Sequence, residues 1–170
     1  MPGAIEIRRL TDSDVEDFRT IRLSALRTAP DAFGSTYASE AARSLNETRE
    51  RIAGSEVFGA YVGGEIVGMI ALRRETYPKV KHKALIWGFF VEPRMQNRGV
   101  GARLMTALIE AARGTVEQIT LMVVKDNEPA LALYERFGFV AYGVEPRALK
   151  TEAGYFDEVL MVKFLGATES

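Results

Sequence analysis

The chain has 170 residues, a formal net charge of −1, a single histidine and no cysteine. Its length suits one full-sized core, and 47% hydrophobic and 26% charged residues are typical of a globular protein. The composition excludes disulfides, thiolate metal ligands, cysteine nucleophiles and histidine-rich metal sites, and the near-neutral charge gives no reason to expect nucleic-acid binding. We therefore expect a single domain over residues 1–170, with a core of about residues 4–165 and a short C-terminal tail.

The first half of the chain predicts a strand and two helices. Residues 4–9 are typical of a short strand. The Thr11–Asp14 cluster predicts a helix N-terminus, because apolar residues then recur at helical spacing as far as Leu26. The stretch TAPDAFGST ends this helix. Ser44–Glu47 has the form of a capping box, which predicts a short second helix that ends at Gly54.

Three strands and a polar turn follow. Residues 57–62 and 65–73 are typical of strands, and Gly63–Gly64 between them is a two-residue hairpin signal. The segment TYPKVKHK predicts a polar turn in which His82 is a solvated surface residue rather than a catalytic base. Residues 84–91, ALIWGFFV, are almost wholly apolar and predict a buried strand.

The second half alternates helices with strands. We expect a helix with an apolar face from Val100 to Ala112, a strand over 118–124, a helix over 127–137 and a strand pair over 139–148 and 155–164. The third of these elements is capped by Asn127 and ended by Gly138. The order β-α-α-β-β-β-α-β-α-β-β predicts a mixed α/β fold with a largely antiparallel first half and one helical crossover.

No segment predicts a membrane span or a signal peptide. The start of the chain, MPGAIEIRRL, carries charge where a signal peptide needs an apolar run. No later segment is long and apolar enough to span a bilayer. We expect a soluble, cytoplasmic protein.

The stretch QNRGVG, Gln96–Gly101, joins the buried strand to the helix that follows. Backbone N–H groups at the start of a helix face outward, and the helix dipole favours negative charge there. Glycine lets an anion approach the backbone because it has no Cβ. The stretch therefore predicts either an ordinary strand-to-helix turn or a cradle for phosphate.

Two common phosphate loops do not fit this stretch. A P-loop requires a lysine after its last glycine, and no lysine follows Gly101. A dinucleotide-binding fingerprint requires a small residue three positions after Gly101, where this chain has Leu104.

Two motifs carry a resemblance to a known family. Gln96-x-x-Gly99-x-Gly101 resembles the Gln/Arg-x-x-Gly-x-Gly/Ala signature of the GNAT superfamily of acetyl-CoA-dependent N-acetyltransferases. Downstream, the run from Asn127 to Phe139, which reads N-x-x-A-x-x-L-Y-x-x-F-G-F, is similar to a second motif of that family. The order of the elements also matches over nearly the whole chain.

The resemblance implies a fold and a cosubstrate. The fold would be a mixed, mainly antiparallel central sheet flanked by helices, with a splay between the strand ending near Val91 and the strand near Leu121–Val124. Acetyl-CoA would lie with its pantetheine in the splay and its diphosphate on the loop amides, and no metal is implied. The implied cofactor-binding residues are Phe89, Phe90, Val91, Gln96, Asn97, Arg98, Gly99, Val100, Gly101, Ala102, Asn127 and Ala130.

The implied reaction is direct transfer of an acetyl group to a primary amine of a small molecule or peptide, through a ternary complex. In proteins that resemble this one, the tyrosine at the position of Tyr134 protonates the leaving thiolate. From the residues alone, packing on the inner face of its helix explains Tyr134 as well, and helix capping explains Asn127. The general base stays open among Glu75, Glu40, Glu145, an outward-facing Glu92, and water.

Other functions and partners stay open. An acyl-CoA-binding sensor or assembly module without turnover stays open. The lack of a glutamate within residues 84–91, where many relatives have one, is a weak argument for it, and the presence of Tyr134 is an argument against it. A pure interaction domain would bind no acetyl-CoA. The acceptor could be an amino acid, a polyamine, an antibiotic or a protein N-terminus, shaped by the first two helices, their loop APDAFGSTYASE and a terminal hairpin that we expect to be salt-bridged. We expect no nucleic-acid or membrane partner and leave a homodimer open.

Overall fold

The structure is a computed structural model that describes residues 3–166. The chain forms two compact units. The first unit comprises Met1–Arg73 and Ile86–Ala112, and the second comprises Arg74–Leu85 and Arg113–Ser170. Most of the predicted C-terminal tail, residues 167–170, lies outside the described residues.

Seven strands form one sheet in the order β1-β2-β3-β4-β5-β7-β6. The β4–β5 pairing is parallel, and the β1–β2, β2–β3, β5–β7 and β6–β7 pairings are antiparallel. The predicted mixed, mainly antiparallel sheet is therefore confirmed. The strands are β1 Ile5–Arg9, β2 Glu56–Val62, β3 Glu65–Arg74, β4 Lys83–Val91, β5 Gln118–Val124, β6 Val140–Thr151 and β7 Gly154–Phe164.

The four predicted helices are also confirmed, and the structure contains one further short helix that the sequence did not predict. Their bounds are α1 Val15–Thr28, α2 Tyr37–Ala41, α3 Leu45–Ala53, α4 Val100–Ala112 and α5 Glu128–Arg136. The short helix α2 lies inside the stretch expected to be a loop. Thr36 caps it by accepting a hydrogen bond from the Ser39 backbone N–H at 3.1 Å.

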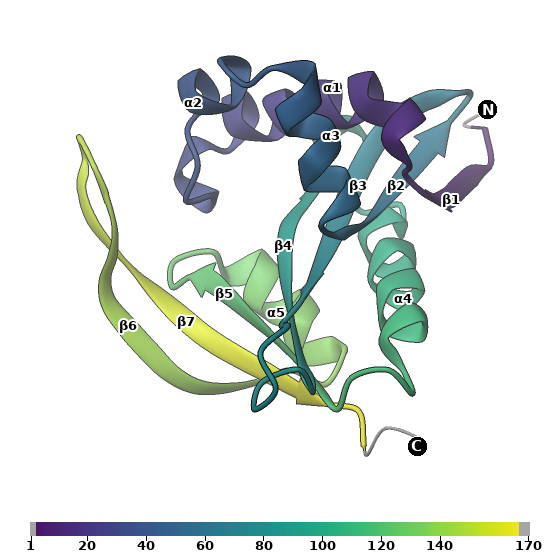
Figure 1. The fold of residues 1–170 in the computed structure, drawn as a ribbon. Helices are drawn as coiled ribbons and strands as arrows, with labels where there is room; N and C mark the ends of the chain where they lie inside the picture. Colours follow the sequence, from purple (N-terminus) through teal and green to yellow (C-terminus); the bar gives the residue numbers. More distant parts are fainter. Residues whose placement is uncertain (1–2, 167–170) are drawn as a thin grey trace. The chain divides into compact units, whose positions relative to one another are not determined.

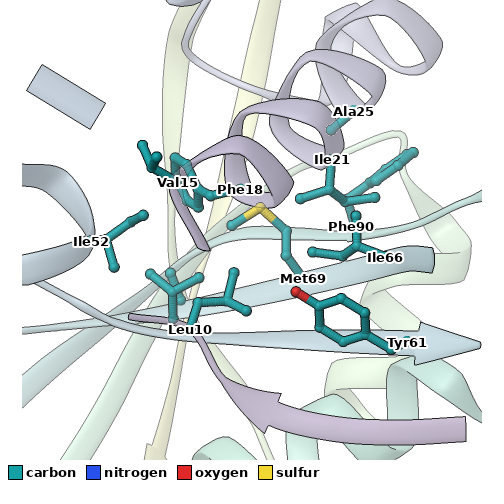
Figure 2. Packing of buried hydrophobic residues seen from close by; sticks show 12 residues of the cluster. Leu10, Val15, Phe18, Ile21, Ala25, Ile52, Tyr61, Ile66, Met69 and Phe90 are labelled. Carbon is teal, nitrogen blue, oxygen red and sulfur yellow. The ribbon is translucent and has the colours of Figure 1, made fainter. Parts of the chain in front are cut away.

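The core of the first unit lies between α1, α3 and the strands β2, β3 and β4 (Figure 2). Phe18 and Ile21 of α1 pack in one cluster with Met69 of β3 and Phe90 of β4. The apolar face of α1 that the sequence predicts therefore packs against β3 and β4.

The opposite face of β3 receives α4 (Figure 1). A Cβ at Gly68 would lie 3.2 Å from Leu104 and 3.4 Å from Val100, both on α4, and 3.1 Å from the Phe90 carbonyl oxygen. Only a residue without a side chain allows this close approach. Because Val100 is the first residue of α4, Gly68 fixes where that helix begins relative to β3 and β4.

The buried strand predicted over 84–91 is only half buried. Along β4, buried residues alternate with half-buried ones, so Ala84, Ile86, Gly88 and Phe90 are buried while the intervening side chains are partly exposed. The strand therefore has a core face and a second face that its apolar sequence did not reveal. The parallel register with β5 covers Lys83–Leu85 and Gln118–Thr120. The splay further along these strands stays a prediction.

In the second unit, β7 pairs with β5 on one side and with β6 on the other. The strands β6 and β7 form a long, curved hairpin (Figure 1). The helix α5 precedes β6, and Gly138 between them has a φ of 89°, a conformation that ends a helix and favours glycine. Over residues 3–166, none of the helices has the length and apolar character needed to cross a membrane.

Candidate functional site

The loop after β4 turns the chain into α4 through two left-handed residues. The 3-10 turn Pro93–Met95 comes first, and Gln96 after it is extended. Asn97 and Gly99 then have φ values of 62° and 80°. The Glu92 N–H donates to the Val67 carbonyl at 2.8 Å, which holds the start of the loop on β3.

The helix α4 begins without a side-chain cap. Thr36, Ser44 and Asn127 each accept a backbone N–H at the start of α2, α3 and α5. The residue at the same place before α4 is Gly99, which has no side chain to do so; its carbonyl accepts the Arg103 N–H at 3.1 Å. The N–H groups of Val100, Gly101 and Ala102 therefore have neither an intrahelical acceptor nor a capping side chain. The first turn of α4 also contains no acidic residue, so an anion there meets no repulsion.

The other predicted residues of this loop have distinct roles. The Gln96 side-chain amide donates to the Val91 carbonyl at 3.2 Å and so ties the loop to the end of β4. Asn97 and Arg98 are exposed. Phe90 packs in the core, so only its backbone could contact a ligand, whereas Phe89 and Val91 are half-buried on the other face of β4.

The remaining predicted residues lie in the second unit, on α5. Asn127 caps this helix, since its Oδ1 accepts the Ala130 N–H at 3.3 Å, as the sequence predicts. Tyr134 is the buried residue of α5, and its ring meets Phe139 edge-on at 6.0 Å between centroids. Burial raises the pKa of Tyr134, so its hydroxyl keeps its proton at neutral pH. The structure thus gathers the loop residues in the first unit and these three in the second.

The carboxylates considered as general base have different surroundings. The expectation that Glu92 faces outward is wrong: the Ser24 hydroxyl of α1 donates to its Oε1. Glu40, which was expected on the rim, is buried and accepts a hydrogen bond from Arg51. Glu75 is half-buried, and its backbone N–H donates to the Lys83 carbonyl at 3.1 Å.

The fourth candidate, Glu145, faces another carboxylate across the terminal hairpin instead of a basic partner. The register of β6 and β7 places Glu145 opposite Glu158, so two like charges face each other. Burial raises the pKa of Glu158, and the charge of Glu145 raises it further. The hairpin gains no attraction from this pair.

We expect Glu158→Gln to stabilise the protein at pH 7 by up to about 1 kcal/mol. A carboxyl whose pKa is raised by folding stabilises the folded state most below its unfolded pKa, about 4.3, and that contribution is lost as the pH rises through the folded pKa. Thermal unfolding at pH 7 and pH 4 measures the difference, which should shrink at pH 4. Glu152→Gln, at an exposed turn position, is the control and should have little effect at either pH. A gain for Glu158→Gln that is equal at both pH values would contradict the electrostatic cause.

A group of charged residues in the first unit was not found from the sequence. Arg22 of α1 is 4% exposed, and Glu40, Arg43 and Arg51 lie near it on and after α2 and on α3. One signal was available, because Arg22 is four residues from both Phe18 and Leu26 and thus lies on the apolar face of α1.

Comparisons with known proteins all identify acetyltransferases. The sequence model described as the acetyltransferase (GNAT) family matches residues 7–139. The L-amino acid N-acetyltransferase AaaT of Escherichia coli is 31% identical over 120 residues, which are 68% of this chain and 74% of that protein. The N-alpha-acetyltransferase RimI of Mycobacterium tuberculosis is 39% identical over 90 residues, 52% of this chain and 54% of that protein. The structure of yncA, a putative acetyltransferase from Salmonella typhimurium with its cofactor acetyl-CoA, has a TM-score of 0.79 at 19% identity and covers 99% of this chain and 98% of that one.

Proposed function

The chain belongs to the acetyltransferase (GNAT) family of acetyl-CoA-dependent enzymes, and we propose that it transfers the acetyl group of acetyl-CoA directly to a primary amine of a small molecule or peptide. The observation that carries this proposal is the start of α4. Three backbone N–H groups follow a glycine with a left-handed φ, no side chain caps them and no acid lies in the first turn. Such an N-terminus suits a diphosphate.

Space at the loop supports the same assignment. A Cβ built on Gly99 would meet nothing within 4 Å, so the outer side of the turn is open to a ligand. We assign the amides from Gln96 to Ala102 to the diphosphate and the backbone of Phe89, Phe90 and Val91 to the pantetheine. Asn127 and Ala130 are assigned to further cofactor contacts. Because Ala130 gives its N–H to the Asn127 cap, such contacts at Ala130 would be made by its other atoms.

The chemistry requires little more than positioning in a ternary complex. The acceptor amine must first lose a proton, since an alkyl ammonium has a pKa of about 10. The amine then attacks the thioester carbon, and a backbone N–H of the β4 segment stabilises the charge on the carbonyl oxygen. Tyr134 is assigned to the leaving thiolate. A glutamate or a water accepts the proton of the amine.

One observation favours a second candidate, an acyl-CoA-binding sensor or assembly module without turnover. The strand β4, Lys83–Val91, contains no carboxylate that could serve as a base. Continuous release of CoA thiol in the presence of a panel of amines would decide for the enzyme. Saturable acetyl-CoA binding without thiol release would decide for the sensor.

Acetyl-CoA and CoA should raise the melting temperature. A ligand at one hundred times its Kd adds about 2.7 kcal/mol to the stability of the folded state. Differential scanning fluorimetry at matched concentrations of acetyl-CoA, CoA, NAD and ATP measures the effect. NAD and ATP should shift the transition much less, because their diphosphates lack the pantetheine. Equal stabilisation by ATP would show that the loop binds anions in general and is not specific for CoA.

The compartment and the partners stay predictions. We propose a cytoplasmic protein that binds neither nucleic acid nor membrane. The oligomeric state stays open, and sedimentation of the purified chain over a range of concentrations would show whether it forms a homodimer.

A further inference from the structure

Arg22 is buried without partners for two of its nitrogens. Its side chain belongs to α1 and the residue is 4% exposed. Among the described residues, no hydrogen-bond acceptor lies within reach of its Nε or its Nη1. Unpaired buried donors destabilise the folded state, and charged donors do so most. Such a group needs an explanation, and a bound anion supplies one.

The surroundings of this guanidinium leave an excess of positive charge. The charged groups that act on Arg22 are Glu40, Arg51 and Arg43. Arg51 donates a hydrogen bond to one oxygen of Glu40, and the other oxygen makes an ion pair with Arg43 Nε at 3.5 Å without a hydrogen bond. Three guanidinium groups thus face one carboxylate. Burial is the main cause that lowers the pKa of Arg22, to about 10, so the side chain is still charged at neutral pH.

The guanidinium also lies against β4, next to the backbone that we assign to the pantetheine. A Cβ at Gly88 would be 3.7 Å from Arg22 Nη1. Gly88 directly precedes Phe89, and consecutive Cα atoms are about 3.8 Å apart. An anion bound at Nη1 would therefore lie next to the β4 backbone assigned to the pantetheine, and both Arg22 and Gly88 belong to the first unit.

Two aromatic rings flank the guanidinium. The ring centroids of Phe33 and Trp87 lie 5.2 and 5.6 Å from its Cζ. Trp87 is fixed by β4, by an edge-on contact with Phe18 and by a hydrogen bond from its Nε1 to Ser55 Oγ. Phe33 is half-buried and lies on the irregular segment between the 3-10 turn Pro30–Ala32 and α2. Both rings pack against the core cluster of the first unit.

We propose that Arg22 binds the carboxylate of the acceptor and that the acceptor class is free α-amino acids. The inference rests on the proposed acetyl transfer, because an anion at Arg22 is useful only if an amine on the same molecule reaches the thioester. An α-amino acid carries its amine and its carboxylate on one carbon, which matches the short separation between Nη1 and the β4 segment. The surplus positive charge repels polyamines, and a protein N-terminus has an amide where the carboxylate is needed.

The test compares each of the common amino acids with its own primary carboxamide, and adds spermidine. Thiol release with acetyl-CoA gives kcat/KM for each acceptor. The best amino acid should exceed its carboxamide at least tenfold, because the site would otherwise leave Arg22 unpaired. This preference opposes intrinsic reactivity, since the carboxamide has the less basic amine and loses its proton more easily. A carboxamide or spermidine that reacts as well as the amino acid would overturn the proposal.

A second measurement needs no variant and no turnover. Trp87 is the only tryptophan of the chain and lies against Arg22, so its fluorescence reports on this site. The best amino acid should change the emission saturably, and its carboxamide should not at the same concentration. Equal responses to both compounds would contradict a carboxylate site.

Arg22→Met removes the charge and keeps much of the side-chain volume. It should lower kcat/KM for the amino acid by about 10- to 100-fold, as expected for a charged hydrogen bond. The kcat/KM for the carboxamide should stay within about threefold of that of the unmodified protein. The thermal shift with acetyl-CoA should stay unchanged. Arg22→Lys should recover part of the loss. Arg49→Met, on the exposed face of α3, is the control.

The outcomes separate this inference from the function on which it rests. Acetyl transfer without preference for a carboxylate, or an equal loss on both acceptors in Arg22→Met, overturns the amino-acid assignment and leaves the acetyltransferase intact. No stabilisation by acetyl-CoA and no transfer to any acceptor overturn both. If Arg22→Met does not fold, the comparison of acid with carboxamide in the unmodified protein decides alone.

Discussion

Gly99→Val should weaken acetyl-CoA binding at least tenfold while the fold survives. Gly99 has a φ of 80°, and holding a non-glycine residue in this region costs about 1–2 kcal/mol. The valine relieves that strain by leaving the left-handed region, which redirects the first N–H groups of α4. Because a Cβ here meets nothing within 4 Å, no core contact is lost. Isothermal titration with acetyl-CoA measures Kd, and 1.4 kcal/mol corresponds to a factor of ten.

The first unit contains a matched control for this substitution. Gly64, in the β2–β3 turn, has a φ of 81° and also has nothing within 4 Å of its Cβ position. Gly64→Val therefore imposes the same backbone strain far along the chain from the loop, and should lower the melting temperature without changing Kd. Gly101→Val is the complementary test, because Gly101 lies within α4 and its replacement adds bulk at the amides without a left-handed φ. Normal acetyl-CoA binding by both loop variants would leave the stretch as an ordinary turn.

The periodic elements could be predicted from the sequence because each depends on neighbours along the chain. The bounds predicted for β5 and α4 agree with the structure, and the α1 and α3 helices were predicted from polar residues at their N-termini and from apolar periodicity or a terminal glycine. The hairpin at Gly63–Gly64 has positive φ at both residues, as that sequence requires. The short helix α2 was missed because five residues are too few to show a helical period.

What the sequence did not predict depends on contacts between distant segments. The Arg22 group draws on α1, on the segment from α2 to Arg43, on α3 and on β4, and no local pattern joins these elements. The pairing of Glu145 with Glu158 depends on two register shifts in β6, at Ala141/Gly143 and at Glu145/Leu149. A shift of one residue moves every side chain to the other face, so charge alternation alone could not give the partner.

The Gln96–Gly101 loop and Tyr134 show the same difference between features with a local sequence signal and features that depend on distant contacts. The glycine spacing at Gln96–Gly101 located the start of α4, because helix N-termini and left-handed residues have local signals. The hydrogen bond from the Gln96 side chain to the Val91 carbonyl joins residues five positions apart and was not predicted. The burial of Tyr134, which raises its pKa, depends on residues outside α5, such as Phe139, whose ring meets it edge-on.

Tyr134→Phe should lower kcat by roughly ten to a few hundred fold and leave acetyl-CoA affinity nearly unchanged. General acid catalysis can contribute 10²–10⁴-fold. The low end is expected here because burial raises the pKa of Tyr134 above its ordinary value of about 10, whereas an alkyl thiol has a pKa of about 8.5. Complete proton transfer to the thiolate is then uphill. The hydroxyl acts mainly by donating a hydrogen bond as the charge appears, and water supplies the final proton.

Phenylalanine keeps the ring, its volume and the edge-on contact with Phe139, so the variant should fold. Tyr142→Phe, on the exposed face of β6, removes a hydroxyl from the same unit and should leave kcat unchanged. Rates are measured at saturating acceptor and acetyl-CoA, with Kd from titration. Since a raised pKa keeps the phenol neutral, the unmodified enzyme should show no fall in kcat from Tyr134 below about pH 10. Full kcat in Tyr134→Phe would show that Tyr134 only packs. Loss of acetyl-CoA affinity would show that Tyr134 contacts the cofactor, and water alone would then protonate the leaving thiolate.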